Sequence, residues 1–188
     1  MNEFIPHDMI LKAQRFKYKY LALPAGIIIL SFLISNLIAD SRWVSLVALA
    51  FYFVLLYIFR FNRTFGEHEE SEVCAPVNGK IVSIKVVSEG AKLTIKKPFF
   101  ASSEVVTCTK NDLINEIDSE QKRVSWMIEC ANSKVFYTGI VRYQATLIGV
   151  VAGNAVCEVF APAVYGLKVE IGEKVVAGMS VIAERSEV

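Results

Sequence analysis

The hydrophobic positions of this chain are concentrated in two uncharged stretches, residues 20–39 and 43–59, near its N-terminus. Twenty helical residues rise about 30 Å, which matches the hydrocarbon core of a bilayer, and 17 residues lie at the short end of the spanning range. Only Asp40, Ser41 and Arg42 separate the two stretches. The pattern therefore predicts a transmembrane helical hairpin over residues 20–60, against the alternatives of a buried hairpin in a soluble core or a re-entrant loop.

The charges that flank these stretches predict their orientation. The basic residues on the outer flanks are Lys12, Arg15, Lys17, Lys19, Arg60 and Arg63. The short connection carries only Arg42, offset by Asp40. Because basic flanks stay on the cytoplasmic side, we expect a two-pass protein of the inner (cytoplasmic) membrane with both termini in the cytoplasm. Residues 1–19 are then a cytoplasmic N-terminal segment.

The pattern changes after residue 60 to short β-branched runs between turn signals. Residues 61–72 are acidic and polar and predict a solvated linker, and residues 73–188 predict a cytoplasmic β-rich domain. The strand-like runs are 80–87, 92–95, 104–109, 124–130, 134–141, 145–151, 155–160, 167–171 and 179–183. Residues 111–120 place Leu113, Ile114 and Ile117 on one helical face and predict one short helix. Many short strands in one domain favour a barrel or a sandwich.

A weak internal repeat narrows the predicted fold. Residues 72–76 read Glu-Val-Cys-Ala-Pro, residues 158–162 read Glu-Val-Phe-Ala-Pro, and a glycine follows each copy within a few residues. This frame resembles the hammerhead repeat of the barrel-sandwich hybrid folds, which include biotinyl and lipoyl carriers. The lysine settings that such carriers modify, Met-Lys-Met or Asp-Lys-Ala, do not occur in the chain. The repeat therefore predicts a barrel-sandwich-like fold and argues against a carrier function.

The charge balance and the cysteine spacing argue against binding of nucleic acid and of metal ions. Residues 61–188 hold 14 basic and 16 acidic side chains without a basic cluster, which argues against nucleic acid. Cys74, Cys108, Cys130 and Cys157 are widely spaced, and neither histidine of the chain lies in a ligand pattern. We therefore expect no metal site and interpret the cysteines as small buried hydrophobes.

Three segments, taken in order, carry a family resemblance. Residues 58–63 read Ile-Phe-Arg-Phe-Asn-Arg, residues 74–82 read Cys-Ala-Pro-Val-Asn-Gly-Lys-Ile-Val, and residues 169–178 read Val-Glu-Ile-Gly-Glu-Lys-Val-Val-Ala-Gly. They are similar to Phe-Phe-Arg-Asp-Pro-Glu-Arg, Ser-Pro-Ala-Asp-Gly-Lys-Val-Val and Val-x-x-Gly-Asp-x-Leu-x-x-Gly. Behind an apolar hairpin, this order resembles the short membrane-anchored phosphatidylserine decarboxylases, over most of the chain but with few identities.

The resemblance implies a chemistry whose parts are missing here. The family cuts itself at a Gly-Ser bond to make a pyruvoyl cofactor, and it uses an aspartate and a histidine to activate that serine. Asn78 occupies the position of the family's aspartate, and Val106 occupies the position of its histidine. The dipeptide Gly-Ser occurs nowhere in the chain. We therefore expect no pyruvoyl cofactor and no decarboxylation. Cleavage at residues 70–71 (Glu-Ser) or 102–103 (Ser-Ser) would instead fit an active, diverged enzyme.

The sequence thus favours a catalytically inactive, decarboxylase-like protein of phospholipid metabolism that acts by binding a lipid or a partner. Asn78, Gly79 and Lys80 are the candidate headgroup contacts, although Lys80 also fits a solvated strand edge. Phe99 and Phe100, after two lysines, predict a buried strand end, with a membrane-touching loop as the alternative. The expected partners are the bilayer, an anionic phospholipid, a second copy in a homodimer or an enzyme of lipid synthesis. The remaining alternative is a membrane-tethered adaptor module.

Overall fold

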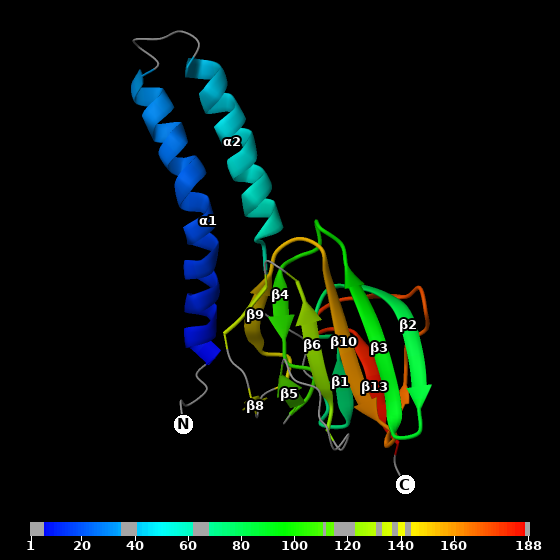
Figure 1. Cartoon of the computed structure of the whole chain (residues 1–188). Helices are drawn as coiled ribbons and strands as arrows, with labels where there is room; N and C mark the ends of the chain where they lie inside the picture. Colours follow the sequence, from blue (N-terminus) through cyan, green and yellow to red (C-terminus); the bar gives the residue numbers. More distant parts are fainter. Residues whose placement is uncertain are drawn as a thin grey trace.

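Two helices stand on one end of a β-rich domain (Figure 1). The computed structural model describes residues 6–34, 41–61, 68–110, 112–114, 123–130, 133–136, 139–141 and 144–186. The predicted arrangement of helices first and a mainly-β domain second is confirmed.

The two helices differ in length and in what they contact. α1 (Pro6–Ile34) has 29 residues, and α2 (Ser41–Ile58) has 18. α1 is long and apolar enough to span a membrane, whereas the apolar part of α2, Trp43–Ile58, is shorter. The helices lie side by side, and the hydroxyl oxygens of Ser31 and Ser45 are 2.7 Å apart across their contact. The expected boundary at residue 19 falls inside α1, because the basic segment continues the same helix.

In the described part of the β domain, thirteen strands form three sheets. A seven-stranded sheet has the order β12-β2-β3-β10-β6-β5-β8, and two three-stranded sheets have the orders β1-β13-β11 and β4-β9-β7. The strands are β1 (Glu72–Cys74), β2 (Gly79–Val87), β3 (Gly90–Lys97), β4 (Glu104–Val106), β5 (Asp112–Ile114), β6 (Ser125–Glu129), β7 (Ser133–Val135), β8 (Gly139–Val141), β9 (Leu147–Val151), β10 (Ala155–Pro162), β11 (Tyr165–Leu167), β12 (Lys174–Val175) and β13 (Val181–Arg185).

The predicted short helix is wrong where the structure describes it. Residues 112–114 form strand β5, which pairs in parallel with β6 and antiparallel with β8. The adjacent pair Leu113 and Ile114 fits both periodicities, and pairing on both sides of the strand decides between them. Residues 111 and 115–120 lie outside the described residues.

The segment predicted to be a solvated linker is partly built into the domain. Glu72 begins β1, and the imidazole of His68 is buried. That ring lies 3.0 Å from the Glu72 carboxylate through Nδ1 and 2.9 Å from the Gly178 carbonyl oxygen through Nε2. Residues 62–67 lie outside the described part of the chain.

Two hydrophobic clusters fix the architecture. The larger lies between the sheets, with Trp126 as its largest fully buried side chain. The cysteine prediction is confirmed for Cys74, Cys108 and Cys157, which are buried, whereas Cys130 is half-buried. The smaller cluster joins both helices to β9 through Ala13, Ile58, Phe59, Leu147, Val150 and Ala152. The N-terminal half of α1 is therefore attached to the side of the β domain.

Candidate functional site

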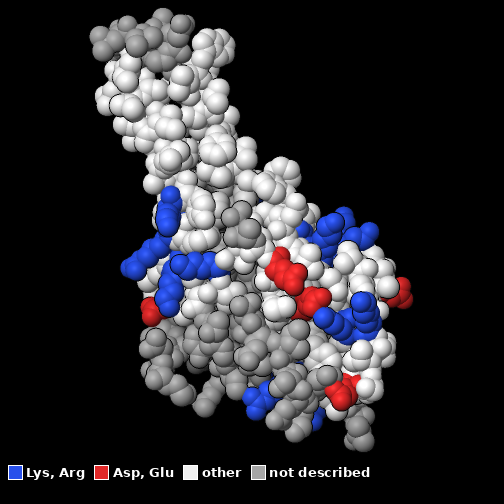
Figure 2. Space-filling model, in the orientation of Figure 1, with Lys and Arg blue, Asp and Glu red and all other residues white. Residues whose placement is uncertain are grey.

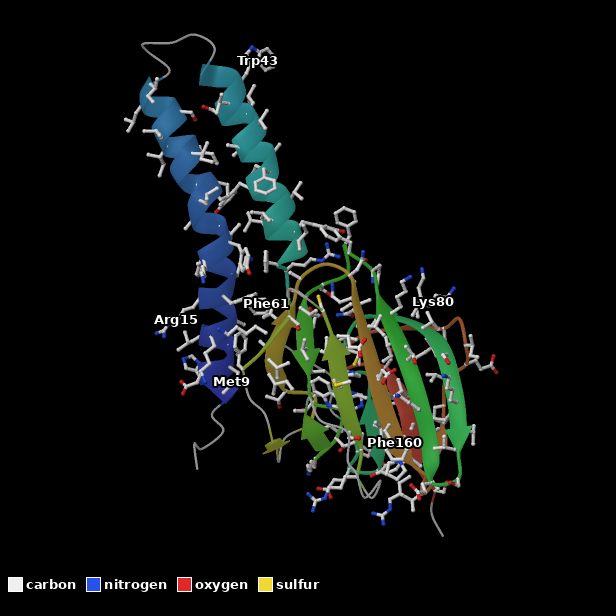
Figure 3. All side chains as sticks on the ribbon, in the orientation of Figure 1. Met9, Arg15, Trp43, Phe61, Lys80 and Phe160 are labelled. Atoms are coloured by element: carbon white, nitrogen blue, oxygen red, sulfur yellow. The ribbon has the colours of Figure 1, made fainter. Side chains whose placement is uncertain are left out.

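A pocket of about 570 Å³ is lined by residues at the start of β2. In Figure 1 this is the end of β2 nearer the helices. The floor of the pocket carries Asn78, Gly79 and Lys80, which begin strand β2 or immediately precede it. The loop after β3 forms one wall with Pro98 and Ala101. Lys80 lies at this end of the domain in Figure 3. The structure thus places the three predicted headgroup contacts around one cavity.

Three lysines from three strands line this pocket side by side. Lys80 on β2 is directly opposite Lys174 on β12 and directly opposite Lys96 on β3. Like charges at directly opposed positions of a sheet are destabilising. Within the described part of the chain, none of the three forms an ion pair with a carboxylate. We refer to Lys174, Lys80 and Lys96 as the lysine row, and its chemistry matches an anionic ligand.

Asn78 is held by hydrogen bonds on both ends of its side-chain amide. Its Nδ2 donates to Oε1 of Glu104 over 2.6 Å, and its Oδ1 accepts from the backbone N–H of Ala177 over 3.1 Å. The Ser102 hydroxyl donates to the same Glu104 oxygen over 2.9 Å. Glu104 is fully buried, and its Oε2 has no hydrogen-bond partner among the described residues. Asn78 therefore forms part of the pocket floor, and both polar atoms of its side chain are already hydrogen-bonded within the protein.

Lys97 fastens the loop that forms the pocket wall. It is fully buried, and its Nζ donates to the carbonyl oxygens of Ala101 over 2.9 Å and of Gly153 over 3.1 Å. Burial lowers the pKa of Lys97 to about 8, and the nearby charge of Glu104 acts in the opposite direction. The Lys97 ammonium group therefore fixes the loop from inside the domain, whereas the lysine row lines the pocket.

Gly79 is required by the close approach of β3. A Cβ at this position would lie 2.7 Å from Cγ2 of Ile95 and 2.7 Å from the carbonyl oxygen of Lys96. Both distances are far below van der Waals contact. The glycine allows β2 and β3 to pair tightly where Lys80 and Lys96 are opposed.

The loop beside the pocket carries two exposed aromatic side chains. Phe99 is 44% exposed and Phe100 is 58% exposed, so the predicted buried strand end is wrong. The Phe100 ring lies 6.2 Å from the ring of Tyr57 near the end of α2. Arg60 stacks over Tyr57 at 3.7 Å and donates to the Phe100 carbonyl oxygen over 3.2 Å. The pocket wall and the end of α2 are therefore one connected structure.

The other family positions do not join this pocket. Val106 is fully buried on β4, and its N–H donates to the Pro76 carbonyl oxygen over 2.9 Å. Residue Ser186, the last one described, donates from its N–H to the carbonyl oxygen of Val164. β13 therefore ends at the opposite end of the domain, as Figure 1 shows. Both serines of the Ser-Ser pair have hydroxyl partners, since Ser103 donates to the Arg60 carbonyl oxygen over 2.9 Å.

Sequence reasoning missed four residues of the site: Lys96, Lys97, Glu104 and Lys174. For Lys97 a signal was present, because two successive lysines on a strand point to opposite faces and one of them must turn inward. For Lys96 and Lys174 the sequence holds no signal, since only the strand register brings them to Lys80.

Comparison with known proteins found no family model, no curated protein and no solved structure that matches this chain. Among the described residues, no three His, Cys, Asp or Glu side chains are grouped so that they could hold a metal ion. The function must therefore be argued from the pocket itself.

Proposed function

We propose that this chain is a two-pass membrane protein whose cytoplasmic β domain binds a phospholipid headgroup in the pocket beside α2. In this proposal it is related to the phosphatidylserine decarboxylases in architecture but acts by binding and not by catalysis. The observation that carries the proposal is the lysine row, three cations opposed across three strands at the end of the domain next to the helices.

The surface of the helices supports the membrane placement. Large apolar side chains of α1 and α2 are strongly exposed, among them Leu23 (68%), Phe32 (74%) and Trp43 (71%). In Figure 2 the described side chains of the helices above the β domain include no Lys, Arg, Asp or Glu on the visible face. Contiguous apolar surface of this kind marks contact with a membrane or a protein. In this proposal the hydrocarbon core of the bilayer covers the exposed apolar surface of both helices.

The position of the pocket suits a lipid that stays in the bilayer. Its wall adjoins Phe99 and Phe100, whose exposed rings lie next to the end of α2. Aromatic side chains favour the interface between headgroups and acyl chains. A lipid could therefore keep its acyl chains beside these rings while its phosphate meets Lys80 and its neighbours. Ammonium groups bind phosphate oxygens through charge-assisted hydrogen bonds.

The residues at the family positions favour binding over catalysis. Asn78 carries no carboxylate, and Val106 offers no proton-transferring group. The chain contains no Gly-Ser bond from which a pyruvoyl group could arise. We therefore propose that the pocket retains recognition of a phosphate-bearing headgroup without a cofactor.

Binding of a short-chain lipid tests this function. Calorimetry would titrate dihexanoyl phosphatidylserine into the detergent-solubilised full-length chain and into the double variant Lys80→Gln, Lys174→Gln. Loss of two phosphate contacts should weaken binding at least tenfold. Lys85→Gln is the matched control, because Lys85 lies on the same strand outside the pocket and should bind like the wild type. Equal affinity of the double variant and the wild type would reject the proposal.

A further inference from the structure

A second basic cleft lies on the opposite side of the β domain, between α1 and β7. It has a volume of about 490 Å³, and the cations that line it are Lys12, Arg15 and Lys19 of α1 and Lys134 of β7. Its apolar lining consists of Phe16, Val135 and Phe136. Figure 2 shows the corresponding group of basic side chains over the lower part of α1.

The helix brings its three cations to one face. Lys12, Arg15 and Lys19 follow the i, i+3, i+7 spacing, and Phe16 lies between them on the same face. Like charges at such spacings disfavour an isolated helix. Asp8, one turn before Lys12, does not line the cleft, and no described acidic side chain does. The arrangement concentrates positive charge without a described counter-charge.

Packing against the β domain gives the cleft a fixed form. Ala13 is fully buried in the cluster that joins α1 to β9. The ring of Phe16 lies 6.4 Å from that of Phe136 and 6.1 Å from that of Phe59. These contacts fix the distance between the cations of α1 and Lys134, which is more than 100 residues away in sequence. The cleft therefore differs from the basic flank of an isolated membrane helix, because its second wall belongs to the β domain.

The depth of the cations identifies the occupant. Lys19, Arg15 and Lys12 precede Tyr20, the first residue of the uncharged stretch, by one, five and eight positions. At about 1.5 Å per residue they lie roughly 2, 8 and 12 Å along the helix axis from it. The polar headgroup region of each leaflet covers the first several ångströms outside the hydrocarbon core. Lys19 and Arg15 are thus level with lipid phosphates, and Phe16, between them in sequence, adds an apolar surface at the same depth.

We propose that this cleft binds the phosphate headgroup of one anionic phospholipid of the cytoplasmic leaflet and so fixes the β domain against the membrane. The proposal uses the membrane placement argued above but not the pocket beside α2. Arg15 offers a planar donor pair for two phosphate oxygens, and the lysines supply point charges around it. Lys134 closes the site from the domain side.

Native mass spectrometry of the full-length chain in detergent tests the site. The chain would be titrated with phosphatidylglycerol, with phosphatidylcholine and with inorganic phosphate. Lys134→Gln lies on an exposed strand position and leaves the membrane flank intact, so it should fold and should bind phosphatidylglycerol about fivefold more weakly at one site. Lys134→Arg should restore the affinity. Lys17→Gln removes the same charge from α1 outside the cleft and should bind like the wild type.

The two lipid sites are separated by combining variants. Lys80→Gln with Lys174→Gln should leave the site probed by Lys134 unchanged, and adding Lys134→Gln should weaken binding at that site by the same factor of about five as in the single variant. Wild-type binding by Lys134→Gln would overturn the proposal. Phosphatidylcholine binding as tightly as phosphatidylglycerol, or full displacement by inorganic phosphate at equal concentration, would overturn it as well.

Discussion

The side-chain amide of Asn78 donates a hydrogen bond to the buried carboxylate of Glu104 over 2.6 Å. Asn78 is thus a neutral donor at the position where the resemblance expects a carboxylate. The pairing explains why an amide suits this chain, because a second carboxylate would face the first inside a buried site. Glu104 instead receives two hydrogen bonds on one oxygen, from Asn78 and from Ser102.

An aspartate at position 78, where the resemblance expects one, should destabilise the protein. Asn78→Asp replaces the donor by a second carboxylate, and we expect a loss of about 3 kcal/mol in the free energy of unfolding at pH 7. Thermal unfolding followed by the fluorescence of buried Trp126 measures it.

Asn154→Asp provides the control for that substitution. Asn154 is exposed on the rim of the same pocket, so the same chemical change should alter stability by less than about 0.5 kcal/mol. If Asn78→Asp is as stable as the wild type at pH 7, the hydrogen bond between Asn78 and Glu104 does not contribute to stability as proposed.

Lys97 should make stability rise with pH on the alkaline side. Burial lowers the pKa of Lys97 to about 8 in the folded chain, while the unfolded chain keeps the ordinary value near 10.5. Between these values the unfolded state binds more protons, so the free energy of unfolding gains on the order of 2–3 kcal/mol from this residue. Lys97→Met should lack that gain between pH 7.5 and 10. Exposed Lys96→Met should retain it, and parallel curves for wild type and Lys97→Met would refute the assignment.

Adding a methyl group at Gly79 should disturb the pocket floor. The new Cβ in Gly79→Ala would meet a side chain and a backbone carbonyl of β3 at 2.7 Å, and we expect a loss of about 2 kcal/mol. In Gly166→Ala the nearest atom is 3.6 Å away, so this change should be nearly neutral. Unfolding temperatures of the two variants, measured side by side, give the comparison. Similar temperatures would show that β2 and β3 separate easily.

Brominated lipid should quench the fluorescence of a tryptophan placed in the loop of Phe99 and Phe100. We propose Phe100→Trp in a Trp43→Phe background, with Trp126 left as a buried reference in the β core. In nanodiscs that contain lipids brominated near the top of the acyl chain, the new indole should lose about half of its emission. Val86→Trp in the same background is the control, because Val86 is 80% exposed near the far end of β2. Equal quenching at both positions would contradict contact between the loop and the bilayer.

The purified protein should be a single uncut polypeptide. Intact mass spectrometry should give 21.0 kDa, because the chain has no Gly-Ser bond. Two fragments, one with a blocked N-terminus, would instead establish self-cleavage and reopen decarboxylation.

The sequence predicts those parts of the structure that depend on local pattern. The uncharged stretches predict both helices, and β-branched runs predict strands such as β2 and β10. The start of α1 was missed although Met9, Ala13 and Phe16 already follow helical spacing. That stretch is short of apolar residues, and its burial against β9 appears only in the fold.

The site itself depends on contacts between distant segments. Lys80 could be singled out from its glycine turn, yet Lys174 lies 94 positions later and joins it only through the pairing of β12 with β2. The partner of Asn78 is equally non-local, because Glu104 sits at the start of a run that otherwise looks like a core strand. Hydrophobic pattern and turn type fix the register within a hairpin, whereas β12 pairs with β2 across most of the domain's sequence.

α1 runs without a break from the flank of the β domain into the apolar zone, and Ala13 ties its lower half to β9. A helix anchored in this way acts as a lever. Bilayers of different thickness change the tilt of a spanning helix, and here each degree of tilt would be transmitted to the attached domain. With the chain placed in a bilayer as proposed, the height of the lysine row above the lipid surface would then vary with the thickness of that bilayer.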